Sequence, residues 1–128
     1  MTSRNKPNEQ ATPLSVGFVL LNRFTLLPFA AFVDCLRLAA DEGDRSRQLR
    51  CSWTFMSSSG SEATSSCGAV ISPCEALKNP EHFDYIVVIG GVQDEKDKTD
   101  HRALDYIRLA AQFGTPLVGL CTGVFALI

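Results

Sequence analysis

Residues 116–125 read PLVGLCTGVF, a short apolar run that leads into a cysteine between two glycines, with a helix-forming segment directly after it. This order is typical of a nucleophile elbow, a sharp strand-to-helix turn that lifts one side chain off the edge of a sheet. Gly119 and Gly123 suit such a turn because a Cβ on either side of it would clash. The start of the helix would direct free N–H groups and a partial positive charge toward Cys121, which favours the thiolate. A lone cysteine is more often a buried structural residue, but the strand, the glycines and the helix start together favour the elbow.

The rest of the chain alternates between two hydrophobic patterns. Near-continuous apolar runs are typical of strands buried on both faces of a parallel sheet. These runs predict strands at residues 16–21, 52–56, 85–89 and 117–120. Helical spacing predicts one helix over 26–40 after an N-cap at Thr25, and another over 101–113 after an N-cap at Thr99 or Asp100.

This alternation predicts a three-layer α/β/α fold with a flavodoxin-like parallel sheet. We expect one domain over residues 15–128, preceded by a disordered polar leader over 1–14. Between the main elements we expect a solvated helix exit at 41–45, a short extended segment at 68–71 and a helical turn at 74–77.

Composition limits the classes of function. The chain has 128 residues, 45% of them hydrophobic, and a net charge of -2, which argues against direct nucleic-acid binding by this domain. No apolar run approaches the roughly 20 residues that span a membrane. The five cysteines are odd in number and show no C-x-x-C spacing, which argues against a zinc site and a disulfide framework. We therefore expect a cytoplasmic protein without a metal or cofactor.

A second glycine pair follows the strand at 85–89. Ligands of parallel sheets bind beyond the carboxyl ends of the strands, so Gly90 and Gly91 should face the same crevice as Cys121. Their N–H groups could form an oxyanion hole, although an isolated Gly-Gly pair is more often only a tight turn. The predicted ligand-binding residues are Gly90, Gly91, Cys121, Thr122 and Gly123.

No general base for Cys121 is evident in the sequence. A cysteine nucleophile needs a base, most often a histidine that a third group orients. Thr122 cannot take a proton at neutral pH, and His82 precedes a strand and so lies at the wrong end of the sheet. His101 opens a helix and is more simply a surface residue. We therefore name no catalytic residue, and regard Cys121 as a vestigial nucleophile.

The first strand and helix, the VVIGG strand end and the GLCTG elbow resemble the ThiJ/PfpI family of the class I glutamine amidotransferase-like superfamily. The resemblance runs from about Val16 to Ile128 and is closest to the branch fused to an AraC-type helix-turn-helix domain. In the enzymes of that family the elbow cysteine precedes a histidine, and an acid from the first helix reaches the sulfur. Alignment on Asp34 places that acid at position 28, which is proline here.

The resemblance implies the amino-terminal, catalytically inactive, ligand-sensing domain of a bacterial AraC-type transcriptional regulator. We expect a small-molecule ligand, DNA contact only through a helix-turn-helix domain outside this chain, no membrane partner and a homodimer. The family continues past Ile128, so we expect the fold to be truncated after the elbow. The alternatives are a cysteine-dependent hydrolase, hydratase or glyoxalase-like enzyme, and a redox sensor that acts through Cys121.

Overall fold

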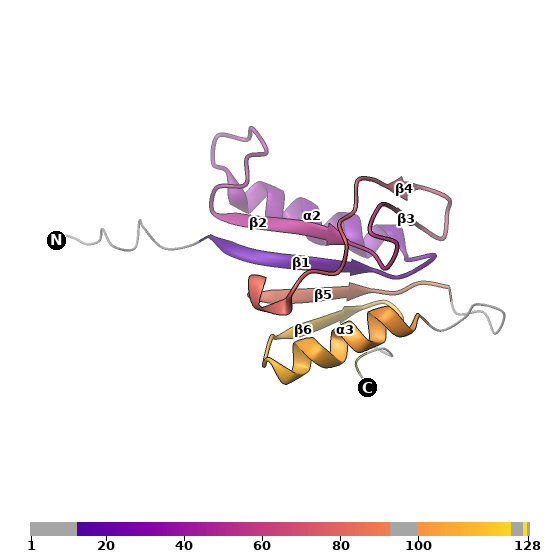
Figure 1. The fold of residues 1–128 in the computed structure, drawn as a ribbon. Coiled ribbons are helices and arrows are strands. Elements are labelled where there is room, and N and C mark those ends of the chain that lie inside the picture. The colour runs from indigo at the N-terminus through magenta and orange to yellow at the C-terminus, as the bar shows by residue number, and fades with distance from the viewer. Residues whose placement is uncertain (1–12, 93–99, 124–126, 128) are drawn as a thin grey trace.

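The structure is a computed structural model that describes residues 13–92, 100–123 and 127. Its centre is a sheet of four strands, β2 (Cys51–Met56), β1 (Leu14–Leu20), β5 (Tyr85–Ile89) and β6 (Leu117–Leu120), in that spatial order. Every neighbouring pair in this sheet is parallel, as predicted (Figure 1). The strands at 85–89 and 117–120 have the predicted bounds, whereas β1 begins two residues and β2 one residue earlier than expected.

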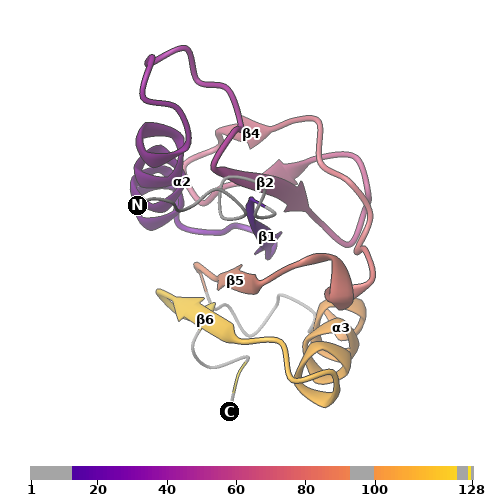
Figure 2. The ribbon, with the colours of Figure 1, turned by 90° about the vertical axis from the view of Figure 1, so that its left-hand side faces the viewer.

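Two helices cover opposite faces of the sheet and complete the three predicted layers (Figure 2). Helix α2 (Leu26–Ala40) packs against Phe18 and Val87, and α3 (His101–Gln112) packs against Val19 and Val88. Successive strand residues point to opposite faces, so β1 and β5 each supply side chains to both layers of core. These strands read as continuous apolar runs because both of their faces are buried.

Aromatic side chains fill the layer between α2 and the sheet. The ring of Phe18 lies edge-on to Phe29, with 5.5 Å between the ring centroids, and also contacts Phe32 and Phe55. Edge-on packing is a favourable arrangement of aromatic rings. This cluster fixes the position of α2, whose first residues lie at the carboxyl edge of the sheet.

Three short elements complete the fold. Strands β3 (Ala63–Thr64) and β4 (Val70–Ile71) form a small antiparallel pair, in keeping with the extended segment expected at 68–71, and η2 (Pro80–His82) is one 3₁₀ turn before β5. No helix within the described ranges is long and apolar enough to cross a membrane. The expected leader at 1–14 lies almost wholly outside the described residues, and β1 begins at Leu14.

The helical turn predicted at Cys74–Leu77 is wrong. This segment is extended and lies along the outer edge of β2, where the Glu75 N–H donates to the Phe55 carbonyl at 2.8 Å. The Glu75 carbonyl in turn accepts from the Ser57 N–H at 3.1 Å. Pairing with β2 satisfies more backbone groups than an isolated helical turn could, so the tertiary contact prevails over local propensity.

The end of α2 also differs from the expected solvated exit. Asp41 is only 4% exposed, and its carboxylate accepts the backbone N–H groups of Gly43, Arg45 and Arg47. The Arg47 guanidinium closes the loop, with Nε 2.9 Å from Oδ2 of Asp41. The hydrogen bond from the Arg47 side chain is the main reason that the pKa of Asp41 lies well below its ordinary value, although burial opposes the shift.

We predict that Asp41→Asn destabilises the protein near neutral pH and matters less in acid. A carboxyl whose pKa is lowered on folding contributes stability that is present above about pH 4 and decreases as the pH falls below it. Urea unfolding near pH 7 and near pH 3 should therefore show a wild-type advantage that shrinks at the lower pH. Asp105→Asn, which removes an exposed i,i+3 partner of Arg108, is the matched control and should change stability little at either pH. An equal effect of Asp41→Asn at both pH values would contradict this account.

Candidate functional site

The turn after β6 has the backbone of the predicted elbow. Cys121 has a φ of 53°, in the left-handed region that a residue with a side chain rarely occupies. A Cβ on Gly123 would lie 2.3 Å from the Val88 carbonyl oxygen, and a Cβ on Gly90 would lie 2.5 Å from the Gly123 nitrogen. The elbow therefore packs so closely on the end of β5 that only glycine fits at either position, and the side chain of Cys121 is exposed at the sheet edge.

Among the described residues, Thr25, which lies directly before α2, contacts the Cys121 sulfur with its side chain. A hydrogen bond of 3.3 Å joins Thr25 Oγ1 to Sγ of Cys121. Thr25 lies at the expected N-cap position, but its side chain makes no capping hydrogen bond and is turned toward the cysteine instead. The structure thus places the hydroxyl of Thr25 beside the sulfur, and the placement of the family's acid at position 28, which is proline here, stays a prediction.

Backbone groups of the glycine pair after β5 already form hydrogen bonds within the protein. The Gly90 N–H donates to the Leu120 carbonyl at 3.3 Å, and the Gly90 carbonyl accepts from the Thr25 N–H at 2.9 Å. The oxyanion-hole hypothesis therefore does not hold for Gly90, because its N–H extends the β5–β6 ladder. The carbonyl of Gly91 accepts a hydrogen bond of 2.8 Å from the Thr122 hydroxyl, which ties the elbow to β5.

The backbone of Gly91 also lies too close to a neighbouring segment, the turn after β1, to leave room for a Cβ. A Cβ there would lie 1.9 Å from the Arg23 carbonyl oxygen, and the same oxygen accepts from the Val92 N–H at 3.2 Å. Arg23 itself has a φ of 58°, so the turn after β1 is also left-handed. The structure thus brings together all five predicted ligand-binding residues, and adds Thr25 and Arg23 from the first turn.

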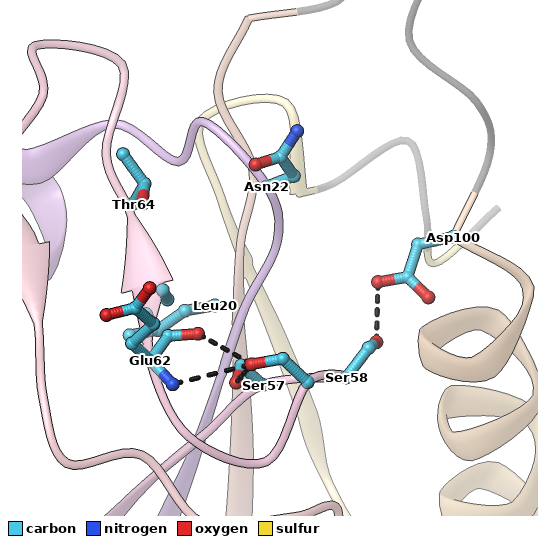
Figure 3. A pocket seen from close by; sticks show the side chains of 9 residues that line it. Leu20, Asn22, Ser57, Ser58, Glu62, Thr64 and Asp100 are labelled. Carbon is cyan, nitrogen blue, oxygen red and sulfur yellow. Dashed lines mark hydrogen bonds between the residues drawn. The ribbon is translucent and has the colours of Figure 1, made fainter.

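A polar pocket of about 220 Å³ opens at the same edge of the sheet, beside the ends of β1 and β2 (Figure 3). Its lining consists of Leu20, Asn22, Ser57, Ser58, Ser59, Glu62, Ala63, Thr64 and Asp100. None of the five predicted ligand-binding residues is among them. No role was assigned from the sequence to the serine-rich stretch after β2, where the density of hydroxyl groups was the available signal for this site.

Hydrogen bonds join the walls of this pocket. The Ser58 hydroxyl donates to Oδ2 of Asp100 at 2.6 Å (Figure 3). Oδ1 of Asp100 accepts from the Ala103 N–H at 3.1 Å. Asp100, one of the two residues predicted for this position, is therefore the N-cap of α3 and also the link between α3 and the end of β2. On the opposite wall the Ser59 hydroxyl donates to the Glu62 carbonyl at 2.9 Å.

The remaining cysteines and the histidines lie apart from the elbow sulfur. Burial raises the pKa of the Cys51 and Cys74 thiols. Cys67 is exposed, and hydrogen bonds with the Ser65 hydroxyl, 3.2 Å away, and the Ala69 N–H lower its pKa. His82 ends η2 before β5, and His101 is the first residue of α3. Within the described ranges no three His, Cys, Asp or Glu side chains are grouped as metal ligands.

Comparison with known proteins relates the chain to transcriptional regulators. No protein-family profile matches it. It is 31% identical over 121 residues to the HTH-type transcriptional regulator GbdR of Pseudomonas aeruginosa, an alignment that covers 94% of this chain and 32% of the regulator. The chain thus spans about a third of the length of that curated relative.

Solved structures share the fold. An AraC family transcriptional regulator from Pseudomonas putida superposes with a TM-score of 0.69 and 26% identity, over 90% of this chain and 60% of that one. A DJ-1 superfamily protein from Agrobacterium tumefaciens gives a TM-score of 0.70 at 17% identity, over 89% of this chain and 56% of that one. The second likeness concerns the fold alone, and it agrees with the predicted flavodoxin-like architecture.

The left-handed conformation of Cys121 predicts an inverted response to glycine substitution. Cys121→Gly should be more stable than Cys121→Ala by about 1 kcal/mol, because only alanine has a Cβ that strains this backbone. At the exposed helical residue Gln112 the order should reverse, with alanine more stable than glycine by a similar amount. Urea unfolding of the four variants measures both differences, and a more stable alanine variant at residue 121 would refute the elbow geometry.

Proposed function

Since the chain is a homologue of AraC-type transcriptional regulators and has the DJ-1/ThiJ/PfpI fold, we propose that it is the ligand-sensing domain of such a regulator. DNA would be bound by a helix-turn-helix domain outside this chain. The observation that carries the proposal is the 31% identity to GbdR over nearly the whole chain. The net charge of -2 supports it, since this domain offers no excess of basic side chains for DNA.

The chemistry around the elbow supports sensing rather than catalysis. The side chain beside the Cys121 sulfur is the Thr25 hydroxyl, which cannot accept a proton at neutral pH. The residue after the cysteine is Thr122, whose hydroxyl is already donated to the Gly91 carbonyl. Thr122 and Pro28 stand at the two positions where the resemblance places the family's histidine and acid, so neither of these positions offers a base or an acid to the sulfur.

The exposed elbow remains a surface at which a small molecule could be recognised. The proposed contacts are Gly90, Gly91, Cys121, Thr122 and Gly123, of which Cys121 supplies the exposed side chain, while the buried Gly90 and Gly123 would act by shaping the turn beneath it. A ligand here would touch the Thr25–Cys121 hydrogen bond and so act on the start of α2. That contact gives a route from ligand occupancy to the position of a helix.

A paired experiment tests sensing against catalysis. In a panel of methylglyoxal and chromogenic amides, the wild type and Cys121→Ala should show the same negligible turnover, because loss of a general base typically removes about 10²–10⁴-fold of rate. Deleting the gene in its source organism should change the transcription of a small set of genes. The complete gene product should bind DNA fragments that contain the promoters of those genes. Robust turnover that Cys121→Ala abolishes would instead establish the cysteine-dependent enzyme.

We further propose a cytoplasmic homodimer. The surface expected to self-associate comprises Phe125, Leu127 and Ile128, of which Phe125 and Ile128 lie outside the described residues. Leu127 is half-buried and packs against the core on the α3 face. One chain has a mass of 13.9 kDa, and light scattering should give twice that mass. The mass of a single chain across a wide range of concentrations would contradict the proposal.

A further inference from the structure

The pocket beside the ends of β1 and β2 has a consistent chemistry. Its nine lining residues include two carboxylates, one amide and four hydroxyl side chains, and none of them is Lys, Arg or His. Figure 3 shows Glu62 and Asp100 on opposite sides, with Asn22 and Ser58 between them in this view. Acid on two sides and the lack of a cation among the described lining residues favour positive charge inside the cavity.

Both carboxylates retain the capacity to bind a further donor. The Glu62 side chain is exposed and makes no ion pair or hydrogen bond with the residues described here. Each oxygen of Asp100 accepts one hydrogen bond, from Ser58 and from Ala103, whereas a carboxylate has about four acceptor positions. Among the described cations, Lys78 pairs with Glu75, and Arg102 donates to the carbonyl of the lining residue Ser58 and to neither carboxylate of the pocket.

We propose that this pocket binds a small ligand that carries a protonated primary or secondary amine together with hydroxyl groups. The amine N–H groups would donate to Glu62 and Asp100, and the ligand hydroxyls would pair with Asn22 and the serines. Leu20 and Ala63, both buried, supply an apolar wall for the carbon skeleton. The volume of about 220 Å³ is large enough for a small polar ligand.

The same lining disfavours two other classes of ligand. A quaternary ammonium group has no N–H to donate and is usually held by aromatic rings, of which the lining has none. A carboxylate ligand would meet two like charges without a cation to pair with it. Selectivity for amines with N–H groups therefore follows from the side chains present.

The inference deepens the proposed sensing function, on which its biological role rests, although the binding itself does not depend on it. The Ser58–Asp100 hydrogen bond joins residues that are 42 positions apart and connects β2 to the start of α3. An amine bound between Glu62 and Asp100 would either compete with the Ser58 hydroxyl for the Asp100 carboxylate or add a further hydrogen bond to it. Binding of the amine would thus change how α3 is held against the sheet.

Two probes of equal size test the proposal. Diethanolamine is a protonated secondary amine with two hydroxyls, and diethylene glycol has a neutral ether oxygen in place of the amine. Titration of the whole chain, followed by amide chemical shifts in NMR, should place the diethanolamine shifts at residues 57–64 and 100. Diethylene glycol should bind about tenfold more weakly at equal ionic strength. Equal affinity of the two probes, or shifts elsewhere, would overturn the proposal.

Substitution of Glu62 supplies the second arm. Glu62→Gln should weaken diethanolamine about three- to fivefold and leave diethylene glycol unchanged, because only the charged probe loses an ionic partner. Glu81→Gln, at an exposed residue in η2 near the amino end of β5, is the matched control and should alter neither affinity. If Glu62→Gln leaves the preference for the amine intact, the proposal is wrong. Amine-selective binding without any transcriptional effect of deleting the gene would reject the sensing function and leave the pocket assignment standing.

Discussion

The approach of backbone to backbone at the carboxyl ends of β5 and β6 is the constraint on which the site depends. Gly123 lies against the Val88 carbonyl and Gly90 lies against the elbow, each with too little room for a Cβ. Because the turn cannot move outward, the chain must reverse at Cys121 in the left-handed region. The exposed position of the sulfur is thus a consequence of how tightly its neighbours pack.

Thr25 connects that constraint to the rest of the molecule. Its N–H donates to the Gly90 carbonyl, and its hydroxyl contacts the Cys121 sulfur. One residue therefore fastens the start of α2 both to the end of β5 and to the elbow. A hydroxyl can hold a thiol in place by hydrogen bonding, but it cannot take its proton, and this difference separates positioning from catalysis.

The main elements could be predicted from sequence because their signals are local. Continuous apolar runs at 85–89 and 117–120 marked their strands, and helical spacing with an acidic N-cap at Asp100 marked α3. The elbow was also predictable, since a tight turn places its glycines close together in sequence.

The features that were missed depend on contacts between distant segments. The extended conformation at Glu75 follows from the edge of β2, 19 residues earlier at Met56, and no local pattern carries that information. The pocket needs Ser58 and Asp100 to meet, and Thr25 faces the sulfur only because the fold brings Cys121, 96 residues further along the chain, back to it.

The two edges of the sheet are unequal. The outer edge of β2 is partly paired, because the backbone of Glu75 bonds to it. Among the described residues, β6 has a neighbouring strand on one side only. A strand with an open edge can accept a further strand through its unpaired N–H and C=O groups, so β6 is the edge at which the described sheet can be extended.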